Sequence, residues 1–302
     1  MKIAMMGSGG VGGYYGARLA QSGEDVTFIA RGKHAEAMRA EGLRIRSEAG
    51  DALVRPVRVV EDSAQAGVQD LIVVGVKLWD LESAAQAIRP MVGPDTAVVS
   101  LQNGVDKDDV LSRAVGAEHV LGGVTHIFAV LSSPGVIQHT GKLARITIGE
   151  LGGGPSQRVE RIGAALRKAG IEVVLSDDIR RVTWETFVFL TSISGMTSLT
   201  RKPVGEVRAH PATRALLLDA LRETSQVARA EGIRLEDGFA EKQLSVIDGL
   251  NPAMLSSMAQ DLLRGNRIEL EWLSGAVVRR AGRLGIPVPA HRAIYAALVL
   301  YA

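Results

Sequence analysis

Cysteine is absent from the sequence, so disulfide scaffolds, thiolate metal sites and cysteine nucleophiles are all excluded. The six histidines form no H-x-x-x-H or H-E-x-x-H pattern, and we expect no metal site. Aromatic residues make up only 4% of the chain, so its core must consist mainly of Ala, Val, Leu and Ile. No apolar run is long enough to cross a bilayer, and we expect no membrane partner.

Neither sign of charge dominates the sequence, because 35 basic residues stand against 33 acidic ones and the formal net charge is +2. Binding to nucleic acid needs a concentrated basic excess, so we expect no nucleic-acid partner. The first residues lack the basic region, apolar run and cleavage site of a signal peptide. Together with the missing cysteines, this pattern predicts a cytoplasmic protein.

A chain of 302 residues is too long for one ordinary hydrophobic core and predicts two domains. In residues 1–175, short apolar runs alternate with helix-like stretches, which predicts an α/β Rossmann domain with a mostly parallel, doubly wound sheet. The strand-like runs are Lys2–Met6, Asp25–Ala30, Leu71–Val76, Ala97–Leu101, Val120–Val130 and Val173–Leu175. Residues Gly141–Glu150 alternate more strictly, which predicts an antiparallel strand added at an edge of the sheet.

From residue 176 onward the apolar positions follow helical spacing and strand signals are almost absent. One predicted helix is capped by Asp177-Asp178 and runs through Trp184 and Phe187. Three more cover Pro211–Gly232, Ile268–Gly285 and Ala290–Tyr301. The second domain, residues 176–302, is therefore predicted to be all-α.

A glycine-rich motif of the form G-x-G-x-x-G lies between the first strand and a helix that begins at Gly10. Gly7 permits a tight turn, Gly9 lets backbone amides approach a pyrophosphate, and Gly12 lets the helix pack close to the sheet. The helix N-terminus adds unpaired N–H groups and a positive dipole end for phosphates. We expect the whole motif to bind a dinucleotide, through Gly7, Ser8, Gly9, Gly10, Val11 and Gly12. The alternative is a glycine turn with a structural role only.

The end of the second strand distinguishes between two cofactors. Folds that bind NAD usually place Asp or Glu there for the ribose hydroxyls, whereas this chain continues into Arg31-Gly32-Lys33. Two cations without a carboxylate suit the 2′-phosphate of NADPH. The alternative is that both are solvated loop charges.

Two further loops follow strand-like runs, Val76-Lys77-Leu78-Trp79 and Leu101-Gln102-Asn103-Gly104-Val105. Doubly wound sheets bind ligands at the carboxyl ends of their strands, where a lysine can contact ribose hydroxyls or polarise a carbonyl group. An Asn-Gly pair can also be a plain turn, so the residues alone leave the function of both loops open.

Several blocks of the sequence resemble the ketopantoate reductase (2-dehydropantoate 2-reductase) family. They are residues 2–12, Ala30-Arg31, Val76-Lys77, Gln102-Asn103-Gly104, residues 256–261, Arg267-Ile268-Glu269 and Gly285-Ile286-Pro287-Val288-Pro289. The resemblance covers nearly the whole chain. It implies a Rossmann domain and a helical domain with the active site in the cleft between them, and NADPH-dependent reduction of a 2-keto acid in pantothenate biosynthesis.

The same resemblance implies the roles of single residues. Arg31 binds the 2′-phosphate of the cofactor, and Lys77 lies near the nicotinamide ribose. Asn103 contacts the nicotinamide end and the substrate, and Ser257 donates a hydrogen bond to the polar end of the substrate. Glu269 contacts the cofactor ribose or orients the catalytic centre.

Two of these assignments depend on the resemblance alone. Ser256-Ser257 also fits a plain helix start after Asn251-Pro252, because serine commonly caps helices. Glu269 and Glu271 are two residues apart on the predicted helix, so they cannot share one face, and only the resemblance selects Glu269.

The chain departs from the family at the first helix of the second domain. The resemblance places a catalytic lysine two residues after Trp184 and asparagines further along, where this chain has Thr186, Leu190 and Ser194. Threonine can donate a hydrogen bond but carries no positive charge, and leucine makes the pocket less polar. We expect Thr186 to be a polar contact, Lys77 or an ordered water to supply the proton, and Leu190 and Ser194 to line the substrate site.

These features predict a homodimeric, NADPH-dependent oxidoreductase that reduces 2-dehydropantoate or a bulkier or more apolar carbonyl compound. Its catalytic residues are predicted to be Asn103, Lys77, Thr186 and Glu269. The alternative is a catalytically weak protein that binds or senses NADPH, which the missing lysine favours. The presence of Lys77, Asn103, Ser257 and Glu269 argues against that alternative, because a protein that only binds the cofactor does not need them.

Overall fold

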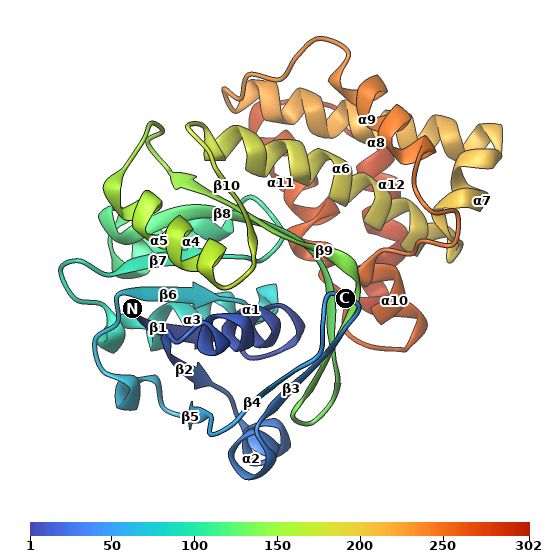
Figure 1. The fold of residues 1–302 in the computed structure, drawn as a ribbon. Helices are drawn as coiled ribbons and strands as arrows, with labels where there is room; N and C mark the ends of the chain where they lie inside the picture. The colour runs from blue at the N-terminus through green and yellow to red at the C-terminus, as the bar shows by residue number, and fades with distance from the viewer. The chain divides into compact units, whose positions relative to one another are not determined.

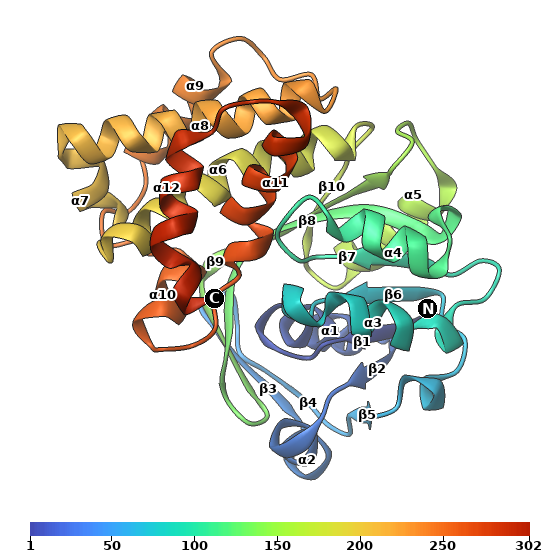
Figure 2. The ribbon, with the colours of Figure 1, turned by 180° about the vertical axis from the view of Figure 1, so that it is seen from behind.

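The computed structural model describes residues 1–302, which separate into two compact units (Figures 1 and 2). Unit 1 contains Met1–Gln102 and Lys107–Ile179, and unit 2 contains Asn103–Asp106 and Arg180–Ala302. The short segment Asn103–Asp106 thus belongs to the second unit, although the chain on both sides of it belongs to the first.

Unit 1 is built on one ten-stranded sheet with the order β4-β3-β9-β8-β7-β6-β1-β2-β5, in which β10 also pairs with β9. The strands are β1 (Lys2–Met6), β2 (Asp25–Ile29), β3 (Leu43–Ser47), β4 (Ala52–Val54), β5 (Arg58–Val60), β6 (Leu71–Val74), β7 (Ala97–Ser100), β8 (Val120–Ser133), β9 (Val136–Glu150) and β10 (Glu172–Leu175). Only β3–β4 and β8–β9 are antiparallel pairs. The predicted doubly wound α/β domain is confirmed.

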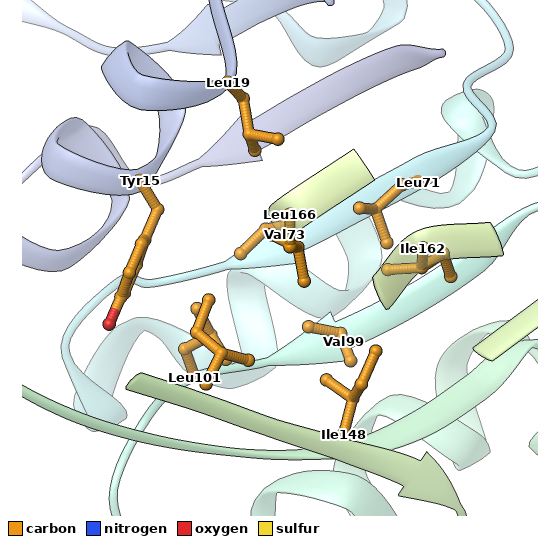
Figure 3. A pocket seen from close by; sticks show the side chains of 10 residues that line it. Tyr15, Leu19, Leu71, Val73, Val99, Leu101, Ile148, Ile162 and Leu166 are labelled. Atoms are coloured by element: carbon orange, nitrogen blue, oxygen red, sulfur yellow. The ribbon is translucent and has the colours of Figure 1, made fainter. Parts of the chain in front are cut away.

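The helices of unit 1 cover both faces of this sheet (Figures 1 and 2). They are α1 (Gly10–Gln21), α2 (Gly32–Glu41), α3 (Leu81–Ala87), α4 (Lys107–Val115) and α5 (Gln157–Lys168). Figure 3 shows side chains of α1 and α5 converging with those of β6, β7 and β9. The void that they enclose has a volume of about 10 Å³. The lining is apolar and the void holds at most one water molecule, so the centre of this unit is packed core and not a ligand cavity.

The predicted edge strand Gly141–Glu150 is antiparallel to its neighbour, but its place at the edge was wrong. β9 has partners on both sides, because β8 pairs along most of its length. On the other side, residues Val136–His139 pair with β3 and residues Arg145–Ile148 pair with β10. β9 begins at Val136, five residues before the predicted start, and this extra length lets it pair with β3 as well as with β10.

Four elements between residues 32 and 60 were not predicted. They are α2, β3, β4 and β5. In β3, Leu43 and Ile45 are fully buried while Arg44 and Arg46 are exposed, which is the period-two pattern of a half-covered strand. The signal was therefore present in the sequence but short.

Unit 2 contains helices and no strand, which confirms the predicted all-α second part. The helices are α6 (Ile179–Thr200), α7 (Val204–Ala209), α8 (Pro211–Ala230), α9 (Phe239–Asp248), α10 (Ser257–Leu263), α11 (Ser274–Leu284) and α12 (Pro289–Leu298). Their apolar faces form one core cluster that includes Phe187, Leu221, Ile247, Val277 and Ile294. None of the helices combines the length and the apolar character that crossing a membrane requires.

The prediction of one helix over Ile268–Gly285 was wrong at its start. The backbone forms a 3-10 turn at Leu270–Trp272, and α11 begins only at Ser274. Leu273 has φ −106° and ψ −101°, which lies outside the helical region and interrupts the helix. Both Leu270 and Leu273 are buried as predicted, so the spacing identified the buried side chains but not the break between them.

A buried histidine ties three helices of unit 2 together. His291 in α12 is fully buried, with Nε2 at 3.0 Å from the carbonyl oxygen of Ala220 in α8. The Thr224 hydroxyl of α8 lies nearer to Nε2, at 2.7 Å, and itself donates to the carbonyl oxygen of Ala220 at 3.0 Å. Because both neighbours of Nε2 then accept, Nε2 carries the proton, and Nδ1 is left to accept from the Ser274 hydroxyl of α11 at 3.3 Å. The Glu223 carboxylate accepts the backbone N–H groups of Ala290 and His291 and caps α12.

We expect this histidine to weaken folding at acid pH. Burial lowers the pKa of His291 from 6.5 to about 4, so the unfolded chain binds a proton between these values that the folded chain does not. The histidine's contribution to the free energy of unfolding is complete above pH 6.5 and falls as the pH drops toward 4, by about 3 kcal/mol in total. This contribution is measured by urea unfolding of the native chain and of the His291→Phe variant between pH 6.5 and pH 4.

The difference between the two unfolding curves isolates the histidine. Burial also raises the pKa of Glu223, which acts in the opposite direction, but that carboxyl is present in both proteins. His291→Phe should be less stable at neutral pH and lose the acid slope. A variant that keeps the native slope would contradict the assignment.

Candidate functional site

The glycine motif forms a tight turn between β1 and α1. Gly7 has φ +97°, and a Cβ atom there would lie 2.7 Å from the backbone nitrogen of Val76. A Cβ atom on Gly12 would lie 2.0 Å from the carbonyl oxygen of Gly7, and one on Gly10 would lie 2.1 Å from that of Ala129. Glycine is therefore required at each of these positions, because any side chain would collide with backbone.

The space around Gly9 is open, since a Cβ atom there would meet nothing within 4 Å. Gly9 is the N-cap of α1, no side chain caps the helix, and its first turn contains no acidic residue. Open space in front of uncapped N–H groups fits a pyrophosphate. The other two residues of the motif face inward, because the Ser8 hydroxyl donates to the carbonyl oxygen of Ile29 and Val11 packs against the core.

The end of β2 carries positive charge, as predicted from the sequence. Arg31 is exposed and is the N-cap of α2, and Lys33 is exposed in the first turn of that helix. This first turn contains no carboxylate. The helix N-terminus and both cations therefore present positive potential at the strand end where the adenosine ribose of a bound dinucleotide lies.

His34 joins three segments of this region. Its Nδ1 accepts the backbone N–H of Gly135 at 3.0 Å, so Nε2 carries the proton and donates to the carbonyl oxygen of Ser8 at 2.7 Å. The imidazole thus holds the glycine turn to the first turn of α2 and to the hairpin that joins β8 and β9. The sequence offered no pattern that identifies this contact.

Lys77 follows β6 and is exposed, with its ammonium nitrogen 5.5 Å from the centre of the Trp79 ring. The backbone before it is held by Gln102, whose Nε2 donates to the carbonyl oxygen of Val76 at 2.8 Å. Gln102 is itself oriented by the hydroxyl of Ser100, which donates to Oε1 at 2.9 Å. The loops that follow β6 and β7 are therefore connected by one side chain.

Within unit 1 the structure brings the predicted cofactor residues together. The glycine motif, Arg31 and Lys77 follow β1, β2 and β6, which are neighbouring parallel strands. The carboxyl ends of parallel strands lie at the same edge of a sheet, which is the ligand-binding edge of doubly wound folds. This edge therefore has the parts of a dinucleotide site.

Asn103 belongs to unit 2 and is half-buried in the segment Asn103–Asp106. Gly104 has φ +97°, which favours glycine and turns the chain. Val105 packs against the core cluster of the helices. The predicted asparagine is thus carried by a turn whose next side chains anchor it in the helical unit.

Thr186, Leu190 and Ser194 are spaced four residues apart on α6, so they share one face of that helix. Thr186 is half-buried, and Leu190 packs against the core cluster. Ser194 is 1% exposed, and its buried hydroxyl has no hydrogen-bond partner. The hydroxyls of Thr191 and Ser198 on the same helix are likewise buried without a partner, so this property does not distinguish Ser194 as a ligand contact.

The serine pair at α10 has two different roles. The Ser256 hydroxyl accepts the backbone N–H of Ala259 at 3.1 Å and lies 2.9 Å from the hydroxyl of Thr197. Ser256 is therefore the helix cap, and this leaves Ser257 as an exposed residue at the start of α10.

Glu269 is half-buried and precedes the 3-10 turn, whereas Glu271 accepts from Tyr295 and from Arg279 at 3.1 Å. Glu271 is thus an ion-pair and hydrogen-bond partner inside the helical unit. No group of three or more His, Asp or Glu side chains is placed to hold a metal ion.

Family models match both parts of the chain. The model described as ketopantoate reductase PanE/ApbA matches residues 3–153, and that of the C-terminal domain of the same family matches residues 178–302. The chain is 31% identical to a 2-dehydropantoate 2-reductase of Mesorhizobium japonicum, over 98% of this chain and 96% of the relative.

Solved structures share the fold over the full length. A PanE/ApbA family ketopantoate reductase from Ralstonia eutropha is 34% identical with a TM-score of 0.91, covering 100% of this chain and 98% of the other. A structure of D-mandelate dehydrogenase with NADH has a TM-score of 0.88 over 99% of this chain and 98% of the other, and its 24% identity supports a likeness of fold alone. The chain is therefore an oxidoreductase that belongs to the PanE/ApbA family of ketopantoate reductases.

Proposed function

We propose that this chain reduces the keto group of a 2-keto acid, 2-dehydropantoate or a related carbonyl compound, with NADPH as the hydride donor. The family consists of nicotinamide-dependent oxidoreductases, and one relative of this chain is a 2-dehydropantoate 2-reductase. The observation that carries the choice of NADPH is the strand end at Arg31 and Lys33, with an uncapped helix N-terminus and no carboxylate. A carboxylate there would repel the 2′-phosphate.

In this proposal, residues of the helical unit bind the substrate. Hydride arriving at a carbonyl carbon leaves negative charge on the oxygen, which needs fixed donors. In this proposal Asn103, Ser257 and Thr186 supply those hydrogen bonds, and Leu190 and Ser194 line the substrate site. Glu269 contacts the cofactor ribose or orients these groups, and Lys77 or an ordered water supplies the proton.

A second function is favoured by one observation. Thr186 stands where the resemblance places a catalytic lysine, and a threonine cannot act as an acid near neutral pH. A protein that binds NADPH and turns over no carbonyl compound would fit this change. The presence of Lys77, Asn103, Ser257 and Glu269 favours the enzyme, because a protein that only binds the cofactor does not need them.

We place the chain in the cytoplasm and in pantothenate biosynthesis, with the domains at residues 1–175 and 176–302. The lack of cysteine suits a reducing compartment. We also propose a homodimer, because the second domain is an apolar helical one.

The test is the consumption of NADPH by the purified chain with 2-dehydropantoate, beside NADH and a blank without substrate. Turnover that prefers NADPH supports the proposal. Tight binding of NADPH with no turnover on 2-dehydropantoate or on a panel of keto acids rejects the reductase and supports the second function. Equal use of both cofactors rejects the role given to Arg31 and Lys33.

A further inference from the structure

An almost buried arginine of α11 is paired with two carboxylates of unit 2. The side chain of Arg280 is 10% exposed. Its Nε donates to Oδ1 of Asp106 at 3.1 Å, and its Nη1 donates to Oε1 of Glu231 at 2.8 Å. The guanidinium carbon lies 5.5 Å from the centre of the Trp184 ring. The cation is therefore held on three sides, by two anions and an aromatic face.

One of these carboxylates is three residues from Asn103. Asp106 ends the segment Asn103–Asp106, which belongs to the helical unit although the strand before it and the helix after it do not. Arg279 lies on the same carboxylate, with its Nη2 at 3.6 Å from Oδ2. Because Val105 also packs into the helical core, two consecutive residues fasten this turn to α11 and its neighbours.

We propose that Arg280 is a positioning residue, which acts through Asp106 to hold the Asn103 turn on the helical unit. This inference rests on the proposed function for the role of the Asn103 amide. A hydrogen-bond donor in a reductase must be held close to its working position, and Gly104 offers no side chain that could anchor the turn. The ion pair keeps Asn103 in one body with α6 and α10, which carry Thr186 and Ser257.

Glu231 offers a matched control for this role. It also accepts from Arg280, and its side chain is about as exposed as that of Asp106, 27% against 33%. It follows the end of α8 and has no connection along the chain to Asn103. Removing either carboxylate therefore costs Arg280 one partner, but only the loss of Asp106 releases the turn.

The experiment compares Asp106→Ala with Glu231→Ala in the full chain, by hydrogen exchange of the amides at 103–106 and by steady-state kinetics. In Asp106→Ala we expect exchange of these amides to be about tenfold faster or more. We expect its kcat to fall about 10- to 100-fold while the Kd for NADPH changes by less than about twofold. Glu231→Ala should leave both the exchange and kcat within about twofold of the native chain.

Arg280→Lys adds a test of the guanidinium itself. A lysine keeps the charge but cannot bridge both carboxylates with a planar fork, so its kcat should lie between those of the native chain and Asp106→Ala. Equal effects of Asp106→Ala and Glu231→Ala on kcat and on exchange would show a merely structural ion pair and overturn the proposal. Native exchange and kcat in Asp106→Ala would overturn it as well.

Failure of the proposed function has a different signature. In that case the native chain itself turns over no keto acid, whichever variant is compared with it. The exchange of the turn in the two variants still decides whether Asp106 and Arg280 hold it.

Discussion

Replacing Arg31 with alanine is expected to raise the Kd for NADPH about 10- to 100-fold and to leave the Kd for NADH within about twofold. The reason is that a charge-assisted hydrogen bond to the 2′-phosphate exists only with NADPH. Arg31 is exposed at the N-cap of α2, and the first turn of that helix offers no carboxylate that would neutralise it. Cofactor fluorescence on titration with the protein measures both constants.

Arg39→Ala is the matched control for that experiment. Arg39 is an exposed arginine in the last turn of the same helix, where it pairs with Glu61 at 3.1 Å. The Arg39→Ala substitution removes the same charge from the same helix, but at the opposite end of that helix from Arg31. A parallel loss of NADH and NADPH affinity in Arg31→Ala, or an equal loss in Arg39→Ala, would mean that Arg31 does not read the 2′-phosphate.

The second large effect is expected at Thr186. Thr186→Lys should raise kcat/KM for 2-dehydropantoate by about 100-fold, because an ammonium group can both stabilise the developing oxyanion and supply a proton. Thr186 is half-buried on the face of α6 that it shares with Leu190 and Ser194. The Kd for NADPH should stay unchanged, since the glycine turn and Arg31, which bind the phosphates in this proposal, are not altered.

Thr186→Met separates the charge from the length of the new side chain. Methionine is similar in length and helix propensity to lysine but has no proton to give. Activity that rises in the lysine variant alone supports the missing acid as the limit on the reaction. Unchanged or lower activity in Thr186→Lys would show that the site uses another proton route, and would direct the search to a substrate other than 2-dehydropantoate.

Much of the cofactor side could be predicted from the sequence, because its determinants are local. A turn after the first strand must be glycine where backbone approaches backbone, and the short contacts at Gly7 and Gly12 show why. The charge at the end of β2 is also a local property, since Arg31 and Lys33 directly follow the strand. Local signals failed where elements are short, as in β3 to β5, or where one buried residue leaves the helical region, as Leu273 does.

The contacts that hold the site were not predictable, because they join residues far apart in the chain. His34 bonds to Ser8 and to Gly135, and Arg280 bonds to an aspartate 174 positions away. No periodicity or motif encodes such pairs, and each residue taken alone resembles a surface charge or a structural histidine. The same holds for β9, whose interior place in the sheet depends on which strands fold against it.

The organisation into an α/β part and an all-α part and the composition of the glycine turn follow from the sequence alone, because periodicity and steric demand act over a few residues. That Asn103 belongs with the helices and that the hydroxyl of Ser194 is buried became apparent only in the folded chain. These properties arise from packing between distant segments, where burial and hydrogen-bond partners are set by the fold as a whole.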